Sequence, residues 1–188
     1  MCIWGLGLLL KIGFYERWKT KGIIMFEEVV SKLLKRHDKT IAVAESCTGG
    51  LISNLLTNIQ GSSKFFLEGI ISYSNQAKKD LLNVSEKLIE EYGSVSAEVA
   101  KAMASGVKEH ACADIGLSVT GIAGPTGVDE RINREKPVGL VYVAMVINGD
   151  MECKEYRFSG SRIDIKKCAA NAALDMLRLG LSKKTTKY

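Results

Sequence analysis

The sequence has few of the residues that bind metals or join into disulfides. Its two histidines, His37 and His110, are far apart, and no two of its five cysteines are close in the chain. The short ligand spacings that mark zinc sites are missing, so we predict no metal and no cofactor. An odd number of cysteines without a secretory cleavage pattern also argues against disulfides. We therefore expect reduced thiols and a cytoplasmic protein.

Basic charge is missing from the body of the chain, although the net charge is +5. Residues 1–24 carry four basic side chains and one acidic one, and residues 178–188 carry four basic side chains and no acidic one. Residues 25–177 are therefore slightly acidic. They contain no arginine-rich helix and no basic patch with interleaved aromatic residues. We therefore expect no nucleic-acid partner.

No apolar run is long enough to cross a bilayer, which requires about 20 residues. Residues 1–10 are apolar, but positive charges follow them, which is the reverse of a signal peptide. We therefore predict no membrane association. The composition changes at Met25, where an amphipathic helix begins. We expect residues 1–24 to be a dispensable extension, residues 25–182 to form one domain and residues 183–188 to be a basic tail.

Amphipathic helices alternate with short apolar strands along the domain, and there is no internal repeat. The patterns predict helices at residues 26–37, 48–58, 76–83, 85–92, 96–110 and 163–179, and strands at residues 40–45, 65–74, 115–120, 138–147 and 152–158. The last two strands flank Asn148-Gly149, a typical hairpin turn, and residues 126–135 are predicted to be a polar loop. This order predicts an α/β fold, a three-layer α/β/α sandwich with a mixed, mostly parallel sheet.

Two glycine-bearing turns follow buried strands. One is Glu45-Ser-Cys-Thr-Gly-Gly50 and the other is Thr120-Gly-Ile-Ala-Gly-Pro125. The carboxyl ends of strands in an open α/β sheet meet in one crevice, so we expect the two turns to lie together. The residues alone allow two interpretations of the first turn. It is either a plain helix N-cap, which is the commoner case, or a nucleophile and anion site at the start of a helix.

Three further segments join the two turns in a recognisable order: Tyr73-Ser-Asn-Gln-Ala-Lys78, Gly93-Ser-Val-Ser96 and Lys136-Pro-Val-Gly139. Together the five motifs resemble the CinA C-terminal domain family over residues 26–179. The characterised members of that family are nicotinamide-nucleotide amidases. The resemblance implies the stand-alone form, without the molybdopterin-binding-like domain that some members carry.

The resemblance also implies a fold and a reaction. The family fold is a three-layer α/β/α sandwich with a mixed sheet. The family reaction is hydrolysis of nicotinamide mononucleotide to nicotinate mononucleotide and ammonia, a step of pyridine nucleotide salvage. One departure is the segment of residues 126–135, which is longer and more charged than the short glycine-rich link of relatives. We expect this departure to affect the fit of the substrate more than the chemistry.

The amidase resemblance assigns the nucleophile to Ser46. No histidine lies in any of the five motifs, so we expect no Ser-His-Asp triad, and lysine is the remaining candidate for the base. Lys78 matches the lysine of the family motif, although its spacing alone would indicate a solvated helix charge. To act as a base it needs burial that lowers its pKa towards neutrality. We predict Ser46 and Lys78 as the catalytic pair.

Cys47 is the rival nucleophile, because a helix N-terminus activates a nearby thiol; its other interpretation is a small buried filler. Neighbouring residues that leave a strand point in opposite directions. We therefore expect only one of Ser46 and Cys47 to face the crevice, and we prefer Ser46. The backbone N–H groups near Thr48, Gly49 and Gly50 are expected to form the oxyanion hole.

The remaining predictions concern the substrate. Thr120 and the backbone of residues 121–124 are expected to bind the 5′-phosphate, and Tyr73 or Asn75 to contact the pyridine carboxamide. Arg162 is either a second phosphate ligand or a surface arginine, and Glu45 either orients the lysine or binds the ribose. The predicted substrate-binding set is Glu45, Thr48, Gly49, Gly50, Tyr73, Asn75, Thr120, Gly121, Ala123, Gly124, Lys136 and Arg162.

A second class of function stays open, a non-catalytic, nucleotide-binding regulatory module of the same family. The long segment of residues 126–135 motivates it, because that segment would close or reshape the crevice. For either function we expect a small-molecule nucleotide as the ligand. We also expect a homo-oligomer, specifically a dimer.

Overall fold

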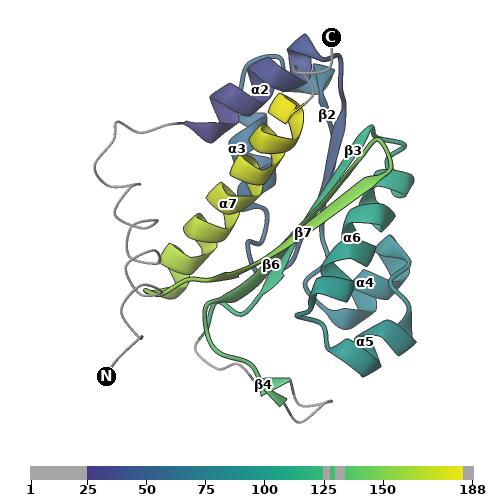
Figure 1. Cartoon of the computed structure of the whole chain (residues 1–188), viewed down its shortest axis with the longest axis vertical. Helices are drawn as coiled ribbons and strands as arrows, with labels where there is room; N and C mark the ends of the chain where they lie inside the picture. The colour runs from purple at the N-terminus through teal and green to yellow at the C-terminus, as the bar shows by residue number, and fades with distance from the viewer. Residues whose placement is uncertain (1–24, 125–127, 130–133, 184–188) are drawn as a thin grey trace, which may run out of the picture.

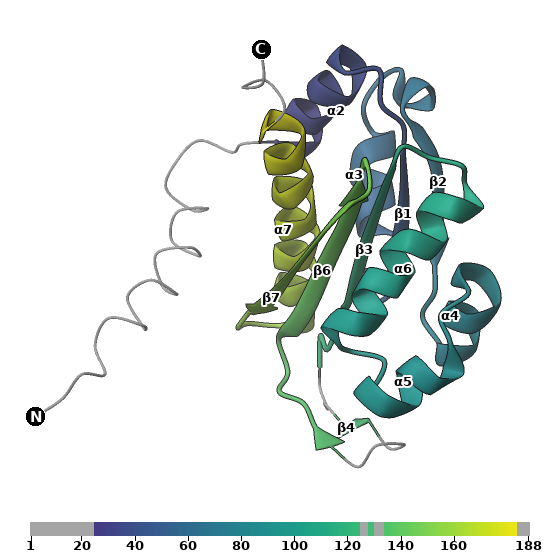
Figure 2. The same ribbon diagram turned by 45° about the vertical axis from the view of Figure 1, so that its right-hand side comes forward.

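A five-stranded sheet forms the middle layer of the computed structural model, which describes residues 25–124, 128–129 and 134–183. The strands lie in the order β2-β1-β3-β6-β7 and span Ile41–Glu45 (β1), Phe66–Ile71 (β2), Ile115–Gly121 (β3), Leu140–Ile147 (β6) and Asp150–Arg157 (β7). β1 pairs in parallel with β2 and β3, whereas β6 runs against the other four strands. Helices cover both faces of this mixed sheet, which confirms the predicted α/β/α sandwich (Figures 1 and 2).

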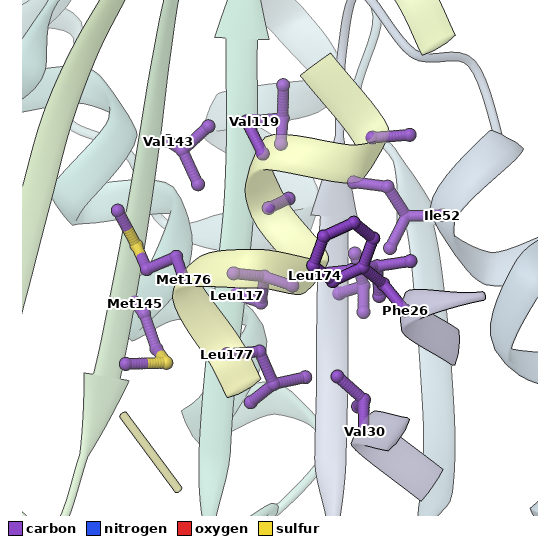
Figure 3. Packing of buried hydrophobic residues seen from close by; sticks show 14 of the residues in the cluster. Phe26, Val30, Ile52, Leu117, Val119, Val143, Met145, Leu174, Met176 and Leu177 are labelled. Carbon is purple, nitrogen blue, oxygen red and sulfur yellow. The ribbon is translucent and has the colours of Figure 1, made fainter. Parts of the chain in front are cut away.

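The first face of the sheet is covered by α2 (Phe26–Arg36), α3 (Leu51–Thr57) and α7 (Arg162–Ser182), as Figure 2 shows. Their apolar side chains pack on Ile41 and Val43 of β1 and on the odd-numbered residues of β3 and β6. Figure 3 shows the centre of this cluster, where Leu174 of α7 lies near Leu117 of β3 and Phe26 of α2. This packing fixes α7 along the sheet, so that its first residues reach the edge where β1 and β3 end.

The second face is covered by α4 (Asn75–Leu82), α5 (Glu86–Tyr92) and α6 (Ala97–His110). Side chains alternate along a strand, so Ala42 and Ala44 of β1 point to this face, and their small size lets the helices approach closely. A Cβ added to Gly106 of α6 would lie only 2.0 Å from the Leu82 carbonyl oxygen at the end of α4. Close packing on α6 therefore fixes the helix that carries Lys78.

Local conformation shifts two of the predicted boundaries. α3 begins at Leu51, three residues later than predicted, because Gly49 and Gly50 adopt positive φ angles of 61° and 92° that no α-helix contains. β2 ends at Ile71, three residues earlier than predicted, because the Ser74 side chain caps α4 by accepting a hydrogen bond from the Ala77 N–H. Both shifts lengthen the connections at the carboxyl edge of the sheet.

The hairpin between β6 and β7 is confirmed. Asn148 and Gly149 have φ angles of 51° and 86°, as a two-residue type I′ turn requires. The segment of residues 126–135, predicted as a loop, contains a two-residue ladder between β4 (Val128–Asp129) and β5 (Arg134–Glu135). Its other residues lie outside the described part of the chain, as do residues 1–24 of the predicted extension and residues 184–188 of the predicted tail.

Within the described residues, no helix combines the length and the apolarity that crossing a membrane requires. The same part of the chain contains no group of three or more histidine, cysteine or acidic side chains arranged to hold a metal ion. Four of the five cysteines are described, and all four are free thiols; Cys2 lies outside the described residues.

Candidate active site

Ser46 is the first residue after β1, at the carboxyl edge of the sheet. Its backbone N–H donates to the Val119 carbonyl oxygen at 3.0 Å, which continues the pairing of β1 with β3 beyond the last residue of β1. Ser46 is 7% exposed and borders a pocket of about 170 Å³. The pocket is lined by Ser46, Cys47, Tyr73, Lys78, Ser94, Val95, Thr120, Gly121, Ala123 and Arg162. Both glycine-bearing turns contribute to it, as the strand order predicts.

Lys78 reaches Ser46 from α4. It is only 1% exposed, and its Nζ lies 3.3 Å from the Ser46 Oγ. The ammonium group also donates to the carbonyl oxygens of Ser72, at 2.8 Å, and Tyr73, at 3.4 Å, which hold it in this position. Burial lowers the pKa of Lys78 from 10.5 to about 8, an effect that Cys47 partly opposes. At pH 7 about a tenth of the molecules then carry a neutral amine at this position, ready to accept a proton.

Both Ser46 and Cys47 are among the residues that line the pocket, so the lining alone does not separate the two candidate nucleophiles. The alternation of a strand ends at Glu45, and the following residues form a tight turn. Cys47 is also part of the core under α7, and burial raises the pKa of its thiol to about 12. A thiol with that pKa stays protonated at neutral pH, which makes it a poor nucleophile. Ser46 therefore remains the candidate nucleophile.

Glu45 caps α3 and does not border the pocket. Its fully buried carboxylate accepts hydrogen bonds from the N–H groups of Gly50 (3.0 Å), Ile52 (3.2 Å) and Ser53 (2.8 Å), and from the Ser53 hydroxyl (2.7 Å). Gly50, the N-cap residue, has no side chain for this role, so Glu45 supplies the acceptors from the preceding strand. The structure therefore supports neither of the two roles expected for Glu45 and gives it a positioning role.

The two glycine N–H groups expected in the oxyanion hole are already bonded within the turn. Gly49 donates to the Ser46 carbonyl oxygen at 3.2 Å, and Gly50 donates to Glu45. Thr48 is fully buried, and its Oγ1 finds no hydrogen-bond partner among the described residues. Neither these two glycines nor Thr48 lines the pocket. Their contribution is the shape of the turn that presents Ser46.

The opposite wall of the pocket comes from the end of β3 and from the connection between α5 and α6. Thr120 is fully buried, and its hydroxyl donates to the Ser94 carbonyl oxygen at 2.8 Å. Lys136 donates from outside the pocket to the carbonyl oxygens of Tyr92, at 2.9 Å, and Val95, at 2.6 Å. Both predicted ligands therefore hold this connection in place.

Arg162, the first residue of α7, is exposed and lines the pocket. Its guanidinium donates to the Tyr73 hydroxyl at 2.9 Å and to the Gly124 carbonyl oxygen. Tyr73 is 60% exposed and lies in the connection between β2 and α4. Arg162 thus joins three segments that are far apart in the sequence, so it is more than a surface arginine. Asn75 begins α4 but does not border the pocket.

The structure gathers seven predicted residues around the pocket: Ser46, Lys78, Tyr73, Thr120, Gly121, Ala123 and Arg162. It adds Cys47, Ser94 and Val95. The sequence did contain a signal for Ser94 and Val95, because both belong to the Gly93-Ser-Val-Ser96 motif, to which we assigned no site residue. No local pattern indicates that this motif lies beside Thr120, since the contact depends on how α6 packs on the sheet.

A family model described as the CinA C-terminal domain matches residues 24–181. The chain belongs to the CinA C-terminal domain family. A putative competence-damage inducible protein of Alkaliphilus metalliredigens is 52% identical over 163 residues, which are 87% of this chain and 39% of that protein. A CinA-like protein of Kosmotoga olearia is 48% identical over 155 residues, 82% of this chain and 37% of that protein. The chain thus spans about two fifths of the length of the curated relatives it matches.

Solved structures of CinA proteins have the same fold. The competence/damage inducible protein CihA from Agrobacterium tumefaciens is 36% identical, with a TM-score of 0.76 over 84% of this chain and 96% of that chain. A CinA superfamily protein from Escherichia coli is 32% identical, with a TM-score of 0.76 over 82% of this chain and 90% of that chain. The pocket therefore lies in a domain whose architecture these CinA proteins share.

Proposed function

We propose that this CinA domain is an amidase that hydrolyses nicotinamide mononucleotide to nicotinate mononucleotide and ammonia. The observation that carries the proposal is the buried pair of Ser46 and Lys78, whose Oγ and Nζ are 3.3 Å apart. Family membership supports the choice of substrate, because characterised members are nicotinamide-nucleotide amidases. The pocket volume of about 170 Å³ supports it as well, since one pyridine carboxamide is a ligand of suitable size.

In the first half of the reaction, the neutral Lys78 amine takes the proton of Ser46 while the Oγ bonds to the carboxamide carbon. The resulting tetrahedral intermediate carries its negative charge on the former carbonyl oxygen. The Lys78 ammonium then gives the proton to the amide nitrogen, and the C–N bond breaks. Ammonia departs, and the acyl group remains bound to Ser46 as an ester. In the second half, Lys78 takes a proton from water, the hydroxide attacks the ester, and the proton returns to Ser46 as the nicotinate leaves.

The oxyanion requires donors that are not already bonded within the turn. In strand–turn–helix nucleophile sites, the N–H of the residue after the nucleophile commonly supplies one of them. We assign this role to the Cys47 N–H and a second donor to the Ala123 N–H, because both residues line the pocket together with Ser46. The lysine and the two N–H groups then act on different atoms of the same carboxamide.

The burial of Lys78 favours turnover over a non-catalytic binding module. Removing an ammonium group from water without a carboxylate partner costs stability. None of the ion pairs within the described ranges involves Lys78. A module that only binds a nucleotide does not need this arrangement, whereas a general base with a pKa near the working pH does.

The proposal is tested by incubating the full chain with nicotinamide mononucleotide and measuring ammonia and nicotinate mononucleotide together. We expect equal amounts of both products from the wild type and a loss of at least about 10³-fold in kcat for Ser46→Ala and Lys78→Met. Cys47→Ala is the matched control and should keep the activity within about tenfold. Binding without release of ammonia by the wild type, or unchanged turnover by Ser46→Ala, would overturn the amidase.

A further inference from the structure

Lys166 lies beside the turn that presents Ser46, although no sequence motif includes it. It follows Arg162 by four residues on α7, so the two side chains project from the same face of the helix. A Cβ added to Gly49 would be 3.4 Å from the Lys166 Nζ, which places the ammonium group directly over the turn. Burial raises the pKa of the neighbouring Cys47 thiol, and the positive charge of Lys166 partly opposes that rise. The charge therefore acts on a residue that lines the pocket.

Lys166 and Arg162 both lack an acidic partner among the residues that the structure describes. Arg162 donates only to a carbonyl oxygen and a tyrosine hydroxyl, which are neutral, and Lys166 makes no hydrogen bond within the described ranges. The acidic groups nearby are engaged elsewhere: Glu45 accepts four hydrogen bonds at the start of α3, and Asp164 closes the capping box of α7 with Ser161. Two basic side chains of α7 without an acidic partner in the described part of the chain thus lie near Ser46: Arg162 lines the pocket, and Lys166 lies over Gly49 in the turn that presents Ser46.

The size of the pocket leaves part of a nucleotide substrate outside it. Sites that enclose a whole drug-sized ligand have volumes of roughly 300–1,000 Å³. The pocket beside Ser46 holds about 170 Å³, enough for one ring with its amide. With the carboxamide at Ser46, the ribose 5′-phosphate reaches beyond this volume, and Arg162 of α7 is among the residues at its border. A phosphomonoester carries nearly two negative charges and three acceptor oxygens at neutral pH, which complement an ammonium and a guanidinium group.

We propose that Lys166, together with Arg162, binds the 5′-phosphate of the substrate and so selects a mononucleotide over the corresponding nucleoside. This inference rests on the proposed amidase function. It revises the expectation that Thr120 and the backbone of residues 121–124 hold the phosphate, because Thr120 is already bonded to the Ser94 carbonyl oxygen. Lys167 is excluded from this role, since the next residue along a helix points about 100° away.

The test compares steady-state kinetics on nicotinamide mononucleotide and on nicotinamide riboside, which lacks the phosphate. For Lys166→Gln we expect the KM for the mononucleotide to rise about 10- to 100-fold with kcat within about threefold of wild type. The kcat/KM for the riboside should not change, and Lys166→Arg should restore most of the affinity for the mononucleotide. Lys167→Gln, an exposed neighbour, is the matched control and should behave as the wild type with both substrates.

A binding measurement separates this inference from the amidase itself. Ribose 5-phosphate and ribose are titrated into wild type, Lys166→Gln and Lys167→Gln by calorimetry. We expect ribose 5-phosphate to bind Lys166→Gln at least about tenfold more weakly than the other two proteins, and ribose to distinguish none of them. If Lys166→Gln weakens the binding of ribose 5-phosphate in this way but none of the proteins releases ammonia, the amidase proposal is refuted and the phosphate site is supported. An active wild type with kinetics and phosphate binding unaffected by Lys166→Gln overturns the inference alone.

Discussion

The Nζ of Lys78 lies 3.3 Å from the Oγ of Ser46, across 32 residues of sequence and two different elements of the fold. The lysine is buried, and two carbonyl oxygens in the connection between β2 and α4 orient its ammonium group. A buried lysine held against a serine is the arrangement that Ser-Lys hydrolases use in place of a histidine triad. The chain achieves it with α4, whose Ser74 cap sets where the helix begins and thus which turn carries the lysine.

The amidase activity should rise with pH and level off above about pH 8, because Lys78 acts as a base only when it is neutral. Burial lowers its pKa to about 8, so kcat/KM should fall about tenfold per pH unit below that value. A pH–rate profile between pH 6 and 10 measures the inflection. Lys78→Arg stays protonated over this range and should be inactive throughout. A flat profile, or an inflection near 10.5, would show that Lys78 is not the base.

Replacing Lys78 with methionine should stabilise the protein while it abolishes activity. The pKa of Lys78 is about 8 in the folded chain and 10.5 when unfolded, so the unfolded state binds the proton more tightly. This destabilises the wild type below pH 8, and the loss is recovered as pH rises from 8 to 10.5. At pH 7 we expect Lys78→Met to unfold with a free energy about 3 kcal/mol larger than wild type.

Urea denaturation of the two proteins at pH 7 and at pH 10 measures this difference. The difference in the free energy of unfolding between the two proteins should be smaller at pH 10 than at pH 7. Comparing the two proteins at each pH cancels the contributions of other titrating groups to stability. One such group is the Cys47 thiol, because burial raises its pKa to about 12. A Lys78→Met protein that is less stable than wild type at pH 7 would contradict the argument.

Glu45→Gln should weaken both the fold and the proposed catalysis. The carboxylate accepts four hydrogen bonds at the start of α3, and an amide nitrogen cannot replace one of its two oxygens as an acceptor. We expect a loss of about 1–3 kcal/mol in the free energy of unfolding. We also expect a drop in kcat with little change in KM, because the Ser46 turn loses its support.

The matched control is Glu68→Gln, the same chemical change in a half-exposed carboxylate that pairs with His110 at 2.8 Å. A surface pair of this kind contributes about 0–1 kcal/mol, so this variant should be nearly as stable and as active as the wild type. Equal effects of the two substitutions would refute the positioning role of Glu45.

Alkylation should leave the activity intact if Ser46, and not Cys47, is the nucleophile. Iodoacetamide reacts with thiolates; Cys112 is exposed, whereas Cys47 is buried with a pKa of about 12. Peptide mass spectrometry after treatment at pH 8 should find the label on Cys112 and not on Cys47, with most of the activity retained. Loss of activity in step with labelling of Cys47, together with an inactive Cys47→Ala, would move the nucleophile to the thiol.

Much of the fold follows from local patterns in the sequence. The alternation of amphipathic and apolar segments predicts the order of helices and strands, because periodicity records which side of each element is buried. Asn148-Gly149 predicts its hairpin, since both residues accept positive φ angles. The two glycine-bearing turns at strand ends predict where the site lies, because parallel strands end at one edge of a sheet.

The roles of individual side chains depend on the tertiary structure. The sequence indicates that Glu45, Lys136 and Lys78 are polar and belong to conspicuous motifs, but not which atoms they meet. Folding brings Glu45 to the start of α3, Lys136 to the carbonyl oxygens of Tyr92 and Val95, and Lys78 to Ser46.

Lys166 belongs to no motif and reaches the Ser46 turn only because α7 packs along the first face of the sheet. The periodicity of apolar residues in the sequence indicates which face of a helix or strand is buried. Contacts between elements, and the loss of water around a charge such as that of Lys78, arise only when the layers close on one another.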